Sequence, residues 1–164
     1  VGIDAAINYW ATRSRLNGFA SYLWGLGKAI AKNYAQPRMK IRIDDLELET
    51  QVLMLGAMNG RREGGGFELA PDFDLQDGLL NVTLVGDGLP IAKVLPIVPK
   101  ILKGQVDDCA GILHRYRAKK ISAEISGAGL IGQADGEILH TGIRSFRAEI
   151  SGETVDLLVP EKER

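Results

Sequence analysis

The spacing of apolar residues changes at Arg38, and this change constrains the fold more than any other feature. Before it, apolar side chains recur at helical spacing, which predicts helix across residues 1–36. Gln36-Pro37 ends that segment, because the residue before a proline avoids the α region. After it, apolar and charged residues alternate, as is typical of strands with one buried face; the first apolar set is Met39, Ile41 and Ile43.

Most of the remaining chain reads as short strands joined by Gly and Asp turns, without a βαβ rhythm. A second helical segment is expected at 89–104, short or kinked because Pro96 and Pro99 lie inside it. The predicted fold is mainly β (α+β): an antiparallel β-sandwich or barrel-like domain with one long N-terminal helix, 14–35, on one face. The expected later strands are 46–49, 52–58, 79–85, 120–125, 133–138, 143–150 and 154–159.

Composition and charge exclude several classes of protein. The 164 residues suit one domain, and a net charge of −1 gives no case for nucleic-acid binding. Cys109 is the only cysteine, so no internal disulfide forms, and no apolar run approaches the roughly 20 residues of a membrane span. We expect a cytoplasmic protein and, since the chain starts at Val1, a domain excised from a longer one.

The stretch Asn59–Val85 carries the candidate chemistry. Three consecutive glycines, Gly64, Gly65 and Gly66, remove every Cβ from the backbone and let another surface approach closely. Asp77, flanked by free carbonyls, offers hard oxygen ligands to a cation such as Mg²⁺. The alternative is a bulged hairpin followed by a solvated acidic turn.

The order N-G-x-x-x-G-G-G-x-x-x-A-P-x-x-x-x-x-D-G-L-L-x-V in this stretch resembles the diacylglycerol kinase catalytic family, which includes bacterial lipid kinases, sphingosine kinases and ceramide kinases. Ala134-Asp135-Gly136-Glu137 resembles the D-G-E element of that family. The resemblance implies that residues 1–164 form the C-terminal lipid-substrate and catalytic-base domain of a two-lobe, ATP-dependent lipid kinase. The G-G-D-G-T loop of the nucleotide lobe is absent from the sequence.

The resemblance also implies roles for individual residues. Glu137 would be the general base with Asp135 beside it, and Asp77 would hold Mg²⁺ together with the main-chain carbonyls of Asp74 and Leu79. ATP would be bound mainly by the missing lobe, which Gly64, Gly65 and Gly66 would face. Asp4, in a segment similar to G-F-x-x-D-A, would accept a substrate hydroxyl. For Asp135-Gly136 and for Asp77-Gly78, a plain turn is the alternative.

The expected partners follow from the same resemblance. The apolar face of the N-terminal helix would line a lipid pocket, with core packing as the alternative. The basic residues between His114 and Lys120, with Lys93, Lys100 and Lys103, would contact an anionic membrane surface, with a solvated face as the alternative. We also expect a homodimer. The rival functions are a non-catalytic lipid-binding sandwich and a distant NAD kinase relative.

Overall fold

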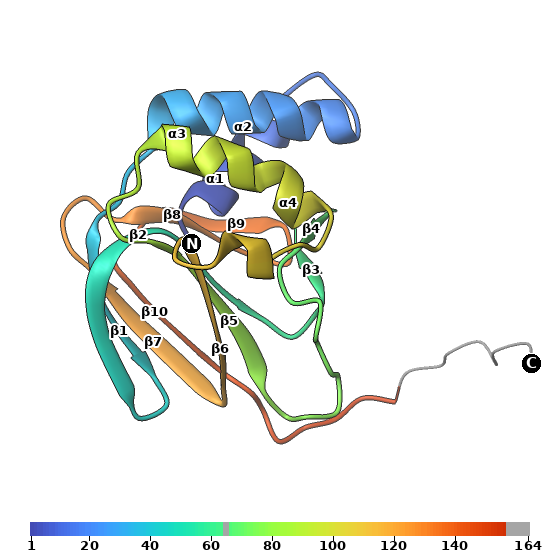
Figure 1. The fold of residues 1–164 in the computed structure, drawn as a ribbon, viewed down its shortest axis with the longest axis vertical. Helices are drawn as coiled ribbons and strands as arrows, with labels where there is room; N and C mark the ends of the chain where they lie inside the picture. Colours follow the sequence, from blue (N-terminus) through green and yellow to red (C-terminus); the bar gives the residue numbers. More distant parts are fainter. Residues whose placement is uncertain (64–65, 157–164) are drawn as a thin grey trace, which may run out of the picture.

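The computed structural model describes residues 1–63 and 66–156, and an open antiparallel sheet is its largest element (Figure 1). The strand order is β10-β7-β1-β2-β5-β6, and every neighbouring pair is antiparallel. The strands are β1 (Arg38–Ile43), β2 (Leu46–Met58), β5 (Leu80–Gly86), β6 (Leu113–Ala118), β7 (Lys120–Ile125) and β10 (Ser145–Glu149).

Strand β2 joins the two apolar cores of the sheet. Val52 and Leu55 pack into a core with β1, β5 and β7, while Leu53 and Met54 pack on the opposite side beneath the segment 89–109. A register shift between Val52 and Met54 interrupts the pairing with β5. The continuous apolar run 52–58 therefore indicated correctly that both faces of this strand are covered.

Two small hairpins lie outside the large sheet: β3 (Arg62–Glu63) with β4 (Phe67–Glu68), and β8 (Leu130–Ala134) with β9 (Glu137–Ile143). The expected strand 133–138 is wrong, because this segment contains the two-residue turn of the second hairpin. Asp135 (φ 48°) and Gly136 (φ 85°) both adopt left-handed backbone angles, as two-residue turns between twisted strands require.

The N-terminal segment forms two helices rather than one long helix. Helix α1 (Ile3–Ala11) and helix α2 (Phe19–Asn33) are separated by an exposed connection, so the prediction of continuous helix across 1–36 is wrong at residues 12–18. The two helices cross closely at Gly25, where a Cβ would lie only 2.4 Å from the carbonyl oxygen of Ile7. This glycine therefore serves the approach of a neighbouring backbone.

The second helical segment is broken, as its prolines predicted. It consists of α3 (Ile91–Val94), the 3₁₀ turn η1 (Leu95–Ile97) and α4 (Val98–Leu102), with a further 3₁₀ turn, η2 (Asp107–Cys109), after it. The C-terminal end of α2 is tied to the start of this segment. Tyr34 Oη and Gln36 Nε2 donate to the carbonyl oxygen of Leu89 at 2.7 and 2.6 Å, and Leu89 N–H donates back to Gln36 at 2.8 Å.

The mainly β, sandwich-like fold is confirmed, and the described residues form no closed barrel. The strand expected at 154–159 is not formed by residues 154–156, and 157–159 lie outside the described residues. Within the described chain, no helix has the length and apolar character needed to cross a membrane.

Candidate functional site: an apolar cavity with an acidic end

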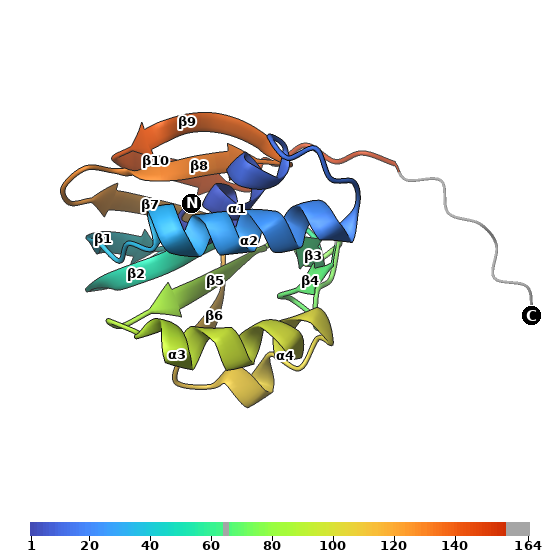
Figure 2. The same ribbon diagram turned by 90° about the horizontal axis from the view of Figure 1, so that it is seen from above.

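An apolar cavity of about 90 Å³ lies beneath α2. Figure 2 shows α2 running between the β8–β9 hairpin and the α3–α4 segment. Tyr22, Leu26 and Ile30 of α2 line the cavity from one side, and residues of α3, η1 and α4 line it from the other. The helical apolar face predicted from the sequence therefore does line a cavity, in addition to packing on the domain.

Two carboxyl groups, from Asp4 and Glu63, form the polar end of this cavity. The amide nitrogen Nε2 of Gln133 lies 3.2 Å from both Asp4 Oδ2 and Glu63 Oε1, so one side chain holds the two acids together. Asp4 Oδ1 and Glu63 Oε2 are buried and have no hydrogen-bond partner among residues 1–63 and 66–156. A ligand that donates hydrogen bonds would satisfy these oxygen atoms, whose burial without a partner is otherwise costly.

The surroundings of Glu63 hold it in its protonated form. Burial, followed by the charge of the neighbouring Asp4, raises the pKa of Glu63 to about 8. The hydrogen bond from Gln133 acts in the opposite direction. At neutral pH the pair therefore retains a proton, and Glu63 can act as a hydrogen-bond donor.

A chain of amides connects the acid pair to the β8–β9 turn. Asn8 is buried on α1, one helical turn after Asp4. Its Nδ2 donates to Gln133 Oε1 at 2.7 Å and to the carbonyl oxygen of Gly136 at 2.5 Å. The turn that follows β8 is therefore fixed to the same polar network that closes the cavity.

An open groove of about 1000 Å³ lies on the other side of this network. Asn59, Gly60, Arg62 and Glu63 of the first motif line it, and so do Asp135 and Gly136 of the second. Tyr22, Glu63 and Gln133 line both the groove and the apolar cavity, so they separate the two spaces. The structure thus brings together two motifs that lie about 70 residues apart in the sequence.

Glu137 and Asp135 are both exposed on this hairpin. Asp135 occupies the turn, which is the plain structural role considered for it, and Glu137 begins β9 opposite Ala134. The described residues therefore do not supply the partial desolvation expected of Glu137.

The glycine triplet is described only in part, because Gly64 and Gly65 lie outside the described residues. A Cβ at Gly66 would lie 3.6 Å from Leu102 Cδ2, which is an ordinary contact. Packing within this chain therefore does not require glycine at position 66.

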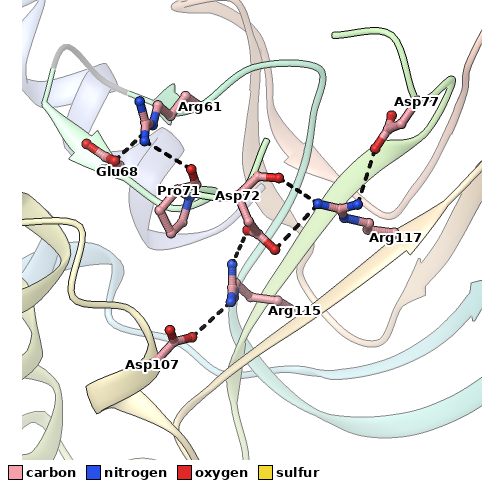
Figure 3. Close-up of polar contacts among 8 residues, drawn as sticks. All are labelled: Arg61, Glu68, Pro71, Asp72, Asp77, Asp107, Arg115 and Arg117. Carbon is pink, nitrogen blue, oxygen red and sulfur yellow. Dashed lines mark hydrogen bonds and ion pairs between the residues drawn. The ribbon is translucent and has the colours of Figure 1, made fainter. Parts of the chain in front are cut away.

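Asp77 lies apart from the cavity, in an ion-pair network between the 69–79 loop and β6 (Figure 3). Its Oδ1 accepts from the N–H of Leu79 at 2.8 Å, and Asp74 makes the same kind of turn with Gln76 N–H at 2.8 Å. Asp77 Oδ2 is buried, accepts no hydrogen bond in the described structure, and lies 3.5 Å from Arg117 Nη1.

The surroundings of Asp77 offer some, but not all, of the ligands that a Mg²⁺ ion needs. The buried, unsatisfied oxygen of Asp77 is a suitable hard ligand, and Mg²⁺ commonly takes one or two carboxylates and keeps several waters. No group of three or more acidic, His or Cys side chains gathers around a metal-sized space in the described residues, so carbonyls and water would supply the other ligands. The guanidinium group of Arg117 competes with a cation for the same oxygen.

The basic residues on β6 are engaged within the molecule. Arg115 pairs with Asp72, and its Nη2 lies 2.9 Å from Asp107 Oδ1, while Arg117 donates to the carbonyl oxygen of Asp72 at 2.6 Å (Figure 3). The two arginines of the expected membrane-binding run therefore hold a loop to the sheet.

Sequence reasoning missed Glu63, Gln133 and Asn8. The spacing of Asp4 and Asn8 was the available signal, because polar residues four apart share one face of a helix that is otherwise apolar. No local pattern marks Gln133, since its role depends on a hairpin that returns to α1.

Together, the fold and site define a β-sandwich-like domain that encloses an apolar cavity with an acidic end. The family model described as "YegS C-terminal NAD kinase beta sandwich-like domain" matches residues 1–159. The chain therefore belongs to this family, as the resemblance indicated.

Relatives with known names agree with this assignment. The "Probable lipid kinase YegS-like" protein of Pseudomonas aeruginosa (strain UCBPP-PA14) is 32% identical over 136 residues, which is 83% of this chain and 42% of the relative. The "Probable lipid kinase YegS" of Escherichia coli (strain SMS-3-5 / SECEC) is 31% identical over 98 residues, 58% of this chain and 30% of the relative. The chain thus spans less than half the length of these curated relatives.

Solved structures agree on the fold. One from Bacillus anthracis str. Sterne matches with a TM-score of 0.57 and 23% identity, covering 85% of this chain and 47% of that one. A second from the same strain, described as a diacylglycerol kinase, has a TM-score of 0.50 and 17% identity, covering 89% of this chain and 44% of that one.

Proposed function

We propose that this chain is the C-terminal domain of a two-lobe, ATP-dependent lipid kinase that phosphorylates a lipid hydroxyl. The observation that carries the proposal is the apolar cavity that ends in the Asp4–Glu63 pair. An acyl chain gains about 0.8 kcal/mol for each methylene group that it buries, and unsatisfied carboxyl oxygens suit a hydroxyl donor. The names of the relatives, probable lipid kinases, support the same class of enzyme.

In this proposal the headgroup lies at the acid pair, and the hydroxyl to be phosphorylated faces the open groove. Glu63 and Gln133 separate the two spaces, which suits a substrate whose apolar and reacting parts lie on opposite sides of them. Glu137 serves as the general base once the nucleotide lobe covers the hairpin, with Asp135 beside it. The nucleotide comes from the other lobe, because the sequence holds no lysine-bearing phosphate loop.

Magnesium has a proposed place in the same scheme. Asp77, with the carbonyls of Asp74 and Leu79, would hold Mg²⁺ and order the loop next to the sheet. When bound, the ion would supply positive charge beside this loop. Binding should appear as a rise of the melting temperature with Mg²⁺ that Asp77→Ala abolishes, which can be measured without any activity assay.

The test is a comparison of variants in the full-length parent protein. Turnover is measured with ATP, magnesium and micelles that contain diacylglycerol, sphingosine or ceramide. Asp4→Asn should reduce kcat/KM by about 100-fold because it removes a buried acceptor at the headgroup, and Glu137→Gln should lower kcat by about 100-fold or more. Unchanged turnover in both variants would refute the proposal, and Glu149→Gln, on the edge strand β10, is the matched control.

The alternative is a non-catalytic lipid-binding domain, for which the cavity alone would suffice. Such a protein would bind lipid equally well with Glu137 or with glutamine at that position, and no variant would show ATP-dependent turnover.

The 164-residue chain by itself should transfer no phosphate. Phosphoryl transfer requires nucleotide, hydroxyl and base within reacting distance at the same time, and this chain lacks a recognisable nucleotide site. ATP-dependent phosphorylation by the purified chain, with contaminating kinase excluded, would contradict the two-lobe interpretation.

A further inference from the structure

Helix α2 exposes an apolar face on the side opposite its attachment to the domain. Phe19, Leu23 and Trp24 are 61%, 54% and 47% exposed, although each is large and apolar. Three further exposed positions of α2 are small and uncharged, namely Ala20, Gly27 and Ala31, and Lys32 is exposed beside the last of them. Exposed apolar side chains at spacings of three and four form one continuous stripe along a helix.

This stripe is independent of the cavity. Residues that line the cavity lie on the inner side of α2, at Tyr22, Leu26 and Ile30, whereas the three exposed side chains do not line it. Helix α2 is the outermost element at one end of the domain (Figure 1). A contiguous apolar patch on an exposed helix is characteristic of a protein or membrane contact.

The charges beside the stripe distinguish between these partners. Arg13, Arg15, Lys28 and Lys32 are the charged residues of the segment 5–37, which contains no aspartate or glutamate. Lys28 lies one helical turn after Trp24, and its Nζ is 4.8 Å from the centre of that indole ring. An apolar stripe flanked by lysine and arginine, with a tryptophan at its edge, suits an anionic bilayer surface.

We propose that the outer face of α2 docks the protein on an anionic lipid bilayer, with Phe19, Leu23 and Trp24 inserted between headgroups and the neighbouring basic residues bound to them. The inference rests on the proposed function in one respect: a kinase that takes its substrate from a bilayer must place the cavity at that bilayer. It also moves the membrane contact away from β6, where Arg115 and Arg117 are already paired with aspartates.

The test uses the full-length parent protein and vesicles, without nucleotide. Flotation with vesicles of equal phosphatidylcholine and phosphatidylglycerol is compared with flotation on phosphatidylcholine alone. Wild type should bind the anionic vesicles preferentially, and Leu23→Ser should weaken binding by about tenfold. The matched control is Leu46→Ser, because Leu46 is a similarly exposed leucine (46%) at the β1–β2 turn and should bind like wild type.

Charge reversal tests the second half of the proposal. Lys28→Glu with Lys32→Glu should abolish the preference for anionic vesicles, whereas Lys119→Glu with Lys120→Glu, at the β6–β7 turn, should leave it intact. The proposal is overturned if the second pair alone reduces binding, or if Leu23→Ser and Leu46→Ser behave alike.

Two further outcomes are informative. If wild type binds no vesicles and sediments as a dimer that Leu23→Ser converts to a monomer, a second copy covers this face and the proposal is wrong. Turnover of substrate in detergent micelles separates this inference from the proposed function, because Leu23→Ser should retain that turnover whereas Asp4→Asn should lose it. Vesicle binding by an inactive Asp4→Asn protein would support docking while leaving catalysis to its own test.

Discussion

Carboxyl groups lie in two contrasting surroundings in this domain. Asp4 and Glu63 are held together by Gln133 at the end of an apolar cavity, with no arginine or lysine among their described contacts. Asp72 instead lies at the surface between Arg115 and Arg117. Burial raises the pKa of Glu63 to about 8, whereas for Asp72 the effect of partial burial is outweighed by hydrogen bonding and the two guanidinium groups, which lower its pKa.

We interpret the buried Asp4–Glu63 pair as a candidate binding site, and the ion-paired Asp72 as a contact that stabilises the loop. The charge of Asp72 is balanced by Arg115 and Arg117, and this pairing holds the loop to the sheet without a ligand. The buried pair has unsatisfied oxygen atoms and retains a proton, so it is costly for stability unless a ligand uses it.

The stability of the chain should fall as the pH rises toward 8. Folding raises the pKa of Glu63 from 4.5 to about 8, so the folded state binds this proton more tightly than the unfolded state does. The resulting stability is fully present below pH 4.5 and decreases as the pH rises from there to about 8. The loss should reach several kcal/mol, at about 1.4 kcal/mol per pKa unit, and Glu63→Gln should remove most of it. Urea unfolding across this range measures the effect, and an equally steep loss in Glu63→Gln would show that Glu63 is not its source.

Asp4→Asn should reduce this pH dependence without removing it. Burial is the first cause of the raised pKa of Glu63, and the charge of Asp4 is the second, so only the second disappears. The same unfolding series provides the measurement. A complete loss of the pH dependence would mean that the charge of Asp4, rather than burial, dominates.

Arg115→Ala should destabilise the chain by about 1 kcal/mol or less, because solvent screens its pairs with Asp72 and Asp107. The pH dependence due to Asp72 has the opposite sign to that of Glu63. Because folding lowers the pKa of Asp72, this carboxyl group stabilises the chain above its ordinary pKa, and the stabilisation is lost as the pH falls. Added salt should diminish the effect of Arg115→Ala, whereas it should leave that of Glu63→Gln nearly unchanged. Salt-dependent unfolding midpoints of the two variants decide this.

The smallest effect is expected for Arg147→Ala. The pair of Arg147 with Glu149 lies on the edge strand β10, and the arginine lowers the pKa of this exposed glutamate. Water replaces such a partner at little cost, so the unfolding midpoint should stay within experimental error of wild type at neutral pH. A clear destabilisation would indicate that this edge strand depends on the pair for its position.

Local patterns in the sequence predicted most of the elements, because hydrophobic period and proline act over a few residues. The change of period at Arg38, the fully covered strand at 52–58 and the broken helix at 89–104 all follow from such patterns. The same reasoning failed at two breaks. The prediction of helix across 1–36 missed the connection between α1 and α2, and the strand expected at 133–138 is interrupted by the Asp135-Gly136 turn that was considered as the alternative.

The candidate site was predicted in part. The motifs led to Asp4, Asp77 and the hairpin of Glu137, and the structure places Asp4 at the end of the cavity. It places Asp77 elsewhere, next to Arg117, and no sequence spacing could indicate that pair because β6 reaches the loop only through its pairing with β5.

Local order along the chain was enough to predict the class of this domain, its family and the residue types available to its site. Which of its acids are protonated depends instead on how the chain folds. The pKa of a carboxyl group depends on burial and on charges within a few ångströms, and for Glu63 those come from residues as distant in sequence as Asp4 and Gln133. The exposed face of α2 was likewise decided by packing, because an apolar helix shows its outer side only once its inner side is buried.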